Sequence, residues 1–109
     1  MNTRYVVLAH TVNGAVHFDL MLEVEGQDRL RTLQLARWPL LPGEEVALTE
    51  LPPHRRDYLT YQGEVSGNRG TVRRVETGTW AQAGATITLN AEDGTVSRLE
   101  VGSTTIKVA

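Results

Sequence analysis

The strongest structural signal in the chain is the recurrence of an apolar residue at every second position over 16–24. Side chains at every second position of an extended strand share one face, so this segment predicts a strand with one apolar face. The apolar positions are Val16, Phe18, Leu20, Leu22 and Val24. Further candidate strands, separated by turn residues such as Pro42-Gly43 and Asp93-Gly94, span 4–12, 30–37, 45–49, 61–66, 71–77, 85–90, 96–101 and 104–108. Short strands at this spacing are typical of a small antiparallel barrel or sandwich, and we expect an all-β barrel.

One segment departs from the strand pattern. Residues 52–59 begin with two prolines, which suit the first turn of a helix, and show no alternation. We therefore expect one short helical turn in an otherwise all-β fold.

Length and composition limit the classes of protein that remain. A chain of 109 residues without repeats or linkers is expected to form one domain, 1–109. The absence of cysteine excludes disulfides and thiolate nucleophiles. With 11 basic and 13 acidic residues, the net charge of -2 argues against binding of nucleic acid by bulk charge, although not against a local phosphate pocket. No apolar run approaches the ~20 residues of a membrane span, and residues 1–4 do not begin a signal peptide, so we expect a cytoplasmic protein.

The dipeptide Asn13-Gly14 predicts a tight hairpin between the first two strands. If it closes a two-residue loop, His10 faces His17 directly, with Cβ atoms roughly 4.5–5.5 Å apart. Asp19 lies two residues beyond His17 and therefore on the same face of the sheet. The turn alone thus groups His10, His17 and Asp19.

Two imidazoles and one carboxylate at this spacing form a facial ligand set for Mn²⁺, Zn²⁺ or Fe²⁺, with positions left for water and substrate. The alternative is a solvated outer face on which three polar residues happen to fall. Because the chain has only three histidines, we favour the metal site.

The third histidine, His54, precedes Tyr58 by four residues. On a helical turn these two side chains would be neighbours on one face and could bind one ligand together. The alternative is a surface turn whose tyrosine packs on the barrel. The later segment Asn68-Arg69-Gly70 could cradle a phosphate, but a plain β-turn fits it better.

Several short motifs follow one another in a fixed order between Tyr5 and Trp80. They are Tyr5-Val6-Val7, His10, His17-Phe18-Asp19 with Leu22-Glu23, Trp38-Pro39, His54 with Asp57-Tyr58, Gly63, Gly70-Thr71-Val72 and Gly78-Thr79-Trp80. The combination of His-aromatic-Asp, Leu-Glu and a distant His-x-x-Asp-Tyr is more specific than any of its parts. In this combination the chain resembles the 3′-phosphoesterase domain of bacterial DNA ligase D, the ligase of end-joining repair.

The resemblance implies a small β-barrel that removes a 3′-terminal ribonucleoside and then a 3′-phosphate from DNA ends, with Mn²⁺ as the metal and Zn²⁺ or another divalent ion as the alternative. By position, His10, His17 and Asp19 would be the metal ligands. His54 would contact or protonate the phosphate, and Tyr58 would hydrogen-bond it. The metal would neutralise phosphoryl charge and lower the pKa of the attacking water. The implied partners are a nucleic-acid 3′ end and a DNA ligase or polymerase.

Two positions depart from that family. The family usually has an arginine two residues after the aspartate, where it clamps the phosphate, and this chain has Met21. Loss of one such donor typically lowers the rate on the order of 10²–10³-fold. Leu8 stands where the family usually has glutamine. Arg37, at a basic position of the family, and Arg56 are the candidate replacements, and Arg73 and Arg74 are also possible.

Two other functions stay open at this point. Loss of the clamp favours a catalytically impaired relative that binds a metal or a nucleic-acid end. A facial-triad Fe²⁺ oxygenase would use His17 and Asp19 with His10 or His54, although the chain is small for that class and shows no cosubstrate site. Phosphate release from a 3′ end would indicate the phosphoesterase. Metal binding without turnover would indicate the impaired relative, and oxygen consumption with Fe²⁺ would indicate the oxygenase.

Overall fold

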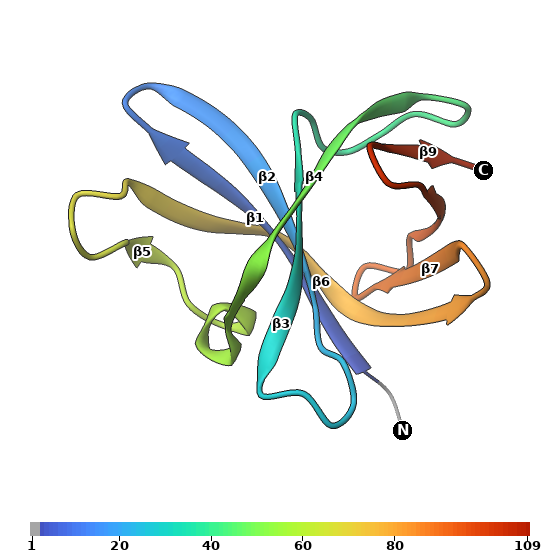
Figure 1. Cartoon of the computed structure of the whole chain (residues 1–109), viewed down its shortest axis with the longest axis horizontal. Coiled ribbons are helices and arrows are strands. Elements are labelled where there is room, and N and C mark those ends of the chain that lie inside the picture. The colour runs from blue at the N-terminus through green and yellow to red at the C-terminus, as the bar shows by residue number, and fades with distance from the viewer. Residues whose placement is uncertain (1–2) are drawn as a thin grey trace.

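A computed structural model describes residues 3–109 of the chain, so Met1 and Asn2 at the start of the N-terminal segment lie outside the described residues. The strands are β1 (Thr3–Val12), β2 (Ala15–Leu22), β3 (Arg29–Leu35), β4 (Glu45–Arg55), β5 (Gly63–Glu64), β6 (Thr71–Ala83), β7 (Thr86–Ala91), β8 (Val96–Val101) and β9 (Thr105–Val108) (Figure 1). A single 3-10 turn, η1 (Arg56–Leu59), is the one helical element of the described part. Accordingly, no helix within residues 3–109 is long and apolar enough to cross a membrane.

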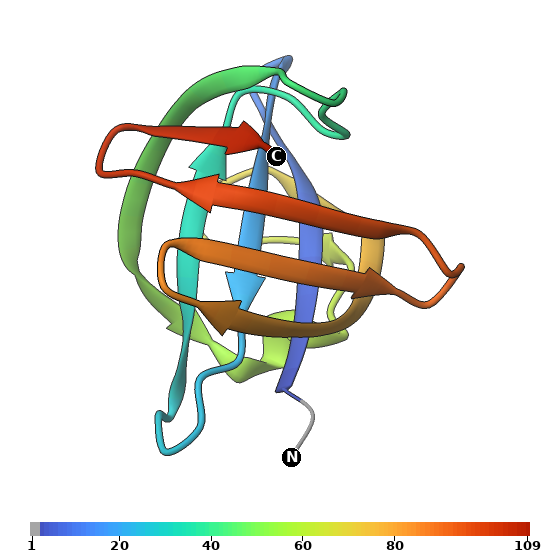
Figure 2. The same ribbon diagram turned by 90° about the vertical axis from the view of Figure 1, so that its right-hand side faces the viewer.

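All strand pairs are antiparallel and eight strands close into a barrel. The order is β1-β2-β3-β4-β9-β8-β7-β6, and pairing of β6 with β1 closes the ring while β5 stays outside it on β6. Figure 2 shows β7, β8 and β9 running across one side of the barrel, in front of β1, β2 and β3. The predicted all-β antiparallel barrel with one short helical turn is confirmed.

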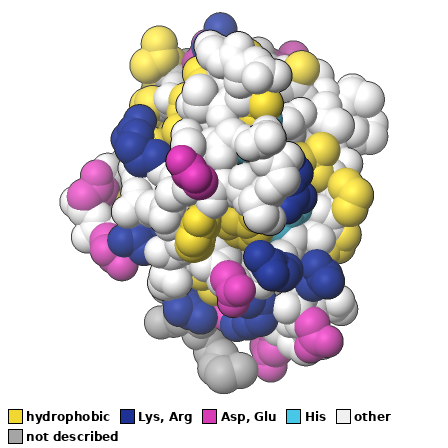
Figure 3. All heavy atoms as spheres, turned by 90° about the vertical axis from the view of Figure 1, so that its left-hand side faces the viewer, with side chains coloured by type: hydrophobic (Ala, Val, Ile, Leu, Met, Phe, Trp, Pro, Cys, Tyr) yellow, Lys and Arg dark blue, Asp and Glu magenta, His cyan; other side chains and the backbone are white. Residues whose placement is uncertain are grey.

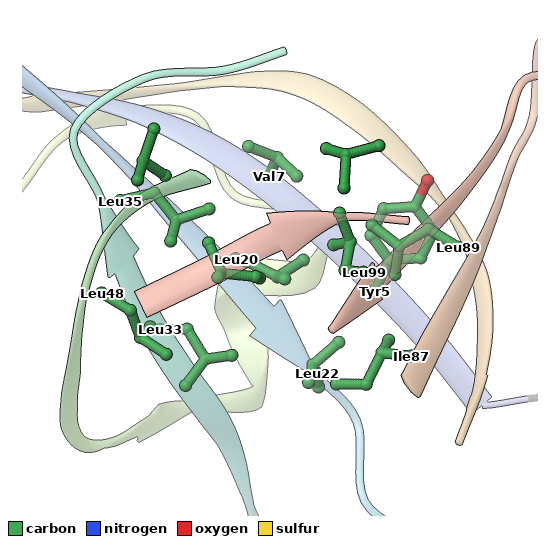
Figure 4. Close-up of a cluster of buried hydrophobic side chains, with 13 residues drawn as sticks. Tyr5, Val7, Leu20, Leu22, Leu33, Leu35, Leu48, Ile87, Leu89 and Leu99 are labelled. Atoms are coloured by element: carbon green, nitrogen blue, oxygen red, sulfur yellow. The ribbon is translucent and has the colours of Figure 1, made fainter. Parts of the chain in front are cut away.

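The barrel interior holds the main hydrophobic core (Figure 4). The alternate residues of β2 and β3 that point inward meet those of β7, β8 and β9. Its buried members are Tyr5, Val7, Leu20, Leu22, Leu33, Leu35, Val46, Leu48, Ile87, Leu89, Leu99, Ile106 and Val108. The predicted apolar face of 16–24 is thus the inner face of β2 at Leu20 and Leu22, with Phe18 packed against the core, whereas Val16 is half-exposed and Val24 lies beyond the strand.

A second apolar cluster lies on the outer face of the sheet. It joins Val6, Leu8, Met21, Leu30, Leu59 and Val72, with Tyr58 and Val65 packed against it. Because η1 and the segment after β5 cover this face, β1 is buried on both sides over five consecutive residues. The outer face of the first hairpin is therefore a covered layer, and the metal-ligand candidates lie on that face.

The predicted helical turn begins later than the sequence indicates. Pro52, Pro53, His54 and Arg55 belong to β4, and only Arg56–Leu59 are helical. The β3–β4 register shifts here, since Leu30 pairs with His54 and Thr32 pairs with Leu51. Such a bulge accommodates prolines, which cannot donate to the sheet, and it redirects the next side chain. The strand predicted over 61–66 shortens to β5, and the one predicted over 71–77 extends to Ala83.

Glu23, just beyond β2, ties together the start of β1 and the start of η1. Its carboxylate accepts hydrogen bonds from the backbone N–H of Arg4 at 2.9 Å, from the Arg4 guanidinium at 3.4 Å, and from the Arg56 guanidinium. Arg4 and Glu23 thereby form an ion pair across the first two strands. Burial alone would raise the pKa of Glu23, but the bonds from Arg4 and Arg56 outweigh it and hold the pKa below the ordinary 4.5.

We expect Glu23→Gln to lower the free energy of unfolding at neutral pH by about 1 kcal/mol, because a neutral amide oxygen accepts more weakly from the guanidinium groups of Arg4 and Arg56. A depressed carboxyl pKa contributes stability above its unfolded value, and that contribution disappears as the pH falls through the folded value. The difference between wild type and variant should therefore close below pH 4.5, the ordinary pKa of this group. Urea denaturation across pH measures it. The exposed neighbour Glu25→Gln is the control, and an equal destabilisation in it would contradict the assignment.

Candidate metal centre

The first hairpin has the predicted register. Asn13 and Gly14 take φ values of 52° and 81°, the left-handed conformations that a tight hairpin turn requires. His10 pairs directly with His17, and Leu8 pairs with Asp19. The local sequence thus places both imidazoles and the carboxylate on the outer face of β1 and β2.

The polar atoms of the three side chains converge on one point. His10 Nδ1 lies 3.0 Å from His17 Nε2, and the imidazole rings meet edge to face with centroids 4.7 Å apart. Asp19 Oδ2 is 3.7 Å from His10 Nδ1, and Asp19 Oδ1 is 3.5 Å from His17 Nε2. One ligand atom from each residue lies within 4.8 Å of the others.

These separations fit a shared metal ion. Ligands at about 2.1 Å from an ion are about 3.0 Å apart at a right angle and about 3.4 Å apart at the tetrahedral angle. The observed 3.0, 3.5 and 3.7 Å lie close to those values. Two imidazoles with one carboxylate suit Mn²⁺, Fe²⁺ or Zn²⁺.

A backbone carbonyl orients the His10 ring. His10 Nε2 lies 2.7 Å from the carbonyl oxygen of Arg69, so Nε2–H donates and the lone pair of a neutral ring is on Nδ1, facing the cluster. Such outer hydrogen bonds are the usual means of fixing a metal-binding histidine. Gly70, at φ 84°, lets the Arg69 turn approach β1, because a Cβ there would be 1.9 Å from the Thr11 carbonyl oxygen.

Asp19 is the least accessible of the three residues. It is 2 % exposed, and its Oδ1 is buried without a hydrogen-bond partner among the described residues. Burial raises the pKa of Asp19, and positive charge on His17, His10 and His54 opposes that rise. The two histidine nitrogens contact each other, whereas this carboxylate oxygen has no hydrogen-bond partner among the described residues. The solvated outer face considered for this set is wrong for Asp19, because the second apolar layer covers it.

His54 and Tyr58 lie beside this centre, on different elements. His54 is near the end of β4, where its Nδ1 contacts the Pro52 carbonyl at 2.8 Å, and Tyr58 is in η1. Their rings meet edge to face at 5.9 Å, so the predicted proximity holds although His54 is not helical. Both line one hollow, together with Arg29, Arg55, Ser66 and Arg69. Figure 3 shows Lys and Arg side chains beside the partly exposed histidines on this side.

The two arginines predicted to bind phosphate contact carboxylates. Arg37 pairs with Glu44, and Arg56 bonds to Glu23 and to the Gln27 carbonyl at 3.4 Å. The hollow that holds His54 and Tyr58 is not lined by either of them. Met21 is buried in the outer cluster with Leu8, so an apolar wall stands where the resembled family has its arginine.

The sequence did not single out Arg29 or Arg55 as ligand-binding residues, and it favoured a plain turn for Arg69. The turn is present, closed by a hydrogen bond from Val65 N–H to the Gly70 carbonyl at 2.8 Å, and the Arg69 side chain also lines the hollow. Arg55 directly follows His54 in the sequence, which is the one local signal that could have found it. Arg29 is recognisable only once β3 is paired with β4.

No family model and no curated protein matches the chain.

Proposed function

We propose that this protein is a divalent-metal-dependent 3′-phosphoesterase that hydrolyses a terminal phosphate or ribonucleoside at nucleic-acid ends, with His10, His17 and Asp19 as ligands of Mn²⁺ or, alternatively, Zn²⁺. The observation that carries the proposal is a buried carboxylate oxygen without a partner, among the described residues, beside two imidazoles, one of them oriented by the Arg69 carbonyl. The resemblance to the ligase D phosphoesterase supports the choice of substrate. We place this activity in the cytoplasm, beside a DNA ligase or polymerase.

The chain's own residues supply binding and proton transfer. The bond of His54 Nδ1 to the Pro52 carbonyl leaves Nε2 as the atom that exchanges a proton with the substrate. Tyr58 offers a phenolic O–H to a phosphate oxygen in the same hollow. A bound divalent ion would supply charge neutralisation and activation of a water molecule. Leu8, which pairs with Asp19, and Met21, two residues along β2, are buried on the same face as the carboxylate and make its surroundings apolar.

A catalytically impaired module that binds a metal or a nucleic-acid end is the second candidate. Met21 favours it, because that side chain is 1 % exposed inside an apolar cluster and offers no cation at the position of the family clamp. The two candidates share the metal centre and differ in turnover.

The test is Mn²⁺-dependent phosphate release from a DNA primer–template that ends in a 3′-phosphate. We expect release by the wild type and a decrease of at least about 100-fold in His17→Ala, because removal of a ligand should exceed the 10–100-fold typical of an outer-shell partner. Val16→Ala, at a half-exposed position of the same hairpin, is the matched control. No release from a wild type that demonstrably binds Mn²⁺ would reject the phosphoesterase and leave the binding module.

A further inference from the structure

Two arginines stand directly opposite each other where β3 meets the end of β4. Arg29 and Arg55 are register partners, so their Cβ atoms are neighbours. Like charges in this position are destabilising unless a counter-charge lies between them. Within residues 3–109, neither guanidinium forms an ion pair with a carboxylate.

This arrangement differs from that of the other arginines nearby. Each of Arg4, Arg31, Arg37 and Arg56 contacts a glutamate carboxylate, from Glu23, Glu50 or Glu44. The third guanidinium of the hollow, Arg69, bonds only to the neutral oxygens of Ser66, at 2.7 and 3.2 Å. Arg29, Arg55 and Arg69 are therefore three guanidinium groups without a carboxylate partner among the described residues that line one hollow, whereas Arg73, Arg74, Arg98 and Lys107, also without such a partner, do not line it.

The position of the hollow relates it to the candidate metal centre. Its lining includes His54 and Tyr58, and the carbonyl of Arg69 binds the ligand His10. A second hollow adjoins it and shares Arg55, Tyr58 and Ser66, and there Tyr61 meets Tyr58 edge to face at 6.0 Å. A strand whose 3′ end lies at the candidate metal centre and that continues through these two hollows would pass the arginines of the first and the tyrosines of the second, on which bases can stack.

We propose that Arg29, Arg55 and Arg69 form an anion subsite that holds an internal phosphodiester of a nucleic-acid strand. The location of the subsite next to the reacting end rests on the proposed function. Guanidinium is suited to this ligand, because its planar fork binds phosphate oxygens in pairs. The subsite involves none of the metal ligands. Its guanidinium groups supply positive charge that Met21, which stands where the resembled family has an arginine, does not supply.

The test measures binding without turnover. A fluorescein-labelled single-stranded oligodeoxynucleotide with a 3′-hydroxyl end is titrated with the protein in EDTA, by anisotropy, between about 50 and 200 mM salt. The double variant Arg29→Gln/Arg55→Gln should bind at least about tenfold more weakly, and the slope of log K against log salt should fall by about 0.7, since the variant neutralises one phosphate fewer. Arg98→Gln/Lys107→Gln removes the same charge from exposed positions on β8 and β9 and should bind as the wild type does.

Unchanged affinity and slope in the Arg29/Arg55 variant would overturn the subsite. An equal decrease in the Arg98/Lys107 control would also overturn it, because bulk charge would then explain the binding. Inorganic phosphate and unlabelled strand are then compared as competitors at equal concentration. If inorganic phosphate displaces the labelled strand as fully as the unlabelled strand does, the site binds free phosphate, and the proposed phosphodiester ligand is rejected. Since the probe has no terminal phosphate and the assay has no metal, failure of the phosphoesterase proposal leaves these outcomes unaffected.

Discussion

Replacing Asp19 with asparagine is expected to make the metal-free chain more stable while abolishing its stabilisation by Mn²⁺. The carboxylate is buried, and Oδ1 has no hydrogen-bond partner among the described residues. A buried polar group without a partner costs roughly 1–3 kcal/mol, and more when it is charged. Asparagine keeps the shape and removes the buried charge. The expected increase is about 1 kcal/mol, or about 4–8 °C in Tm for a domain of this size.

Added Mn²⁺ should reverse the order of the two proteins. At a concentration of about 100 times its Kd, a ligand that binds only the native state adds about 2.7 kcal/mol, which the wild type should gain and Asp19→Asn should not. Thermal denaturation in EDTA and then in excess Mn²⁺ measures both effects. Asp28→Asn, an exposed aspartate in the turn before β3, should leave both melting temperatures unchanged. A lower Tm for Asp19→Asn in EDTA would show that the histidines already neutralise the carboxylate.

The grouping of His10, His17 and Asp19 was predictable because its geometry is local. Asn13-Gly14 sets the register of the hairpin, and the period of two then decides which side chains share a face with His10. The burial of Asp19 was not predictable in the same way. It depends on Leu59 and Val72, which come from distant segments that cover the outer face. Alternation in β2 distinguishes an inner from an outer face, but it does not show that the outer face is covered as well.

The hollow beside the metal centre was less predictable because long-range pairing builds it. Pro52 and Pro53 indicate the start of a helix, yet a β-bulge accommodates them and β4 continues to Arg55. Arg29 pairs with Arg55 only because of that shifted register. Sequence position alone points to Arg37 and Arg56 as phosphate ligands, and position does not reveal the glutamates that each of them contacts.

Gly70→Ala is expected to lower both stability and metal affinity, although residue 70 contacts no metal ligand through a side chain. Its φ is 84°, and a Cβ would be 1.9 Å from the Thr11 carbonyl oxygen, so the turn must move away from β1. The Arg69 carbonyl then no longer fixes His10 Nε2–H at 2.7 Å. Removal of an outer-shell partner weakens metal binding by about 10–100-fold, and the strain and overlap should cost roughly 2 kcal/mol of stability.

Gly78→Ala separates these two effects. A Cβ at Gly78 would be 2.0 Å from the Asn90 carbonyl oxygen, an equally severe overlap between β6 and β7, away from the histidines. Calorimetric titration with Mn²⁺, at a temperature where both variants are folded, should show reduced affinity in Gly70→Ala and wild-type affinity in Gly78→Ala. If Gly70→Ala does not fold, Ser66→Ala loosens the same turn by removing the hydroxyl that accepts from Arg69 at 3.2 Å. Equal affinities in all these proteins would mean that the Arg69 carbonyl is incidental, and that the hairpin alone determines the orientation of His10.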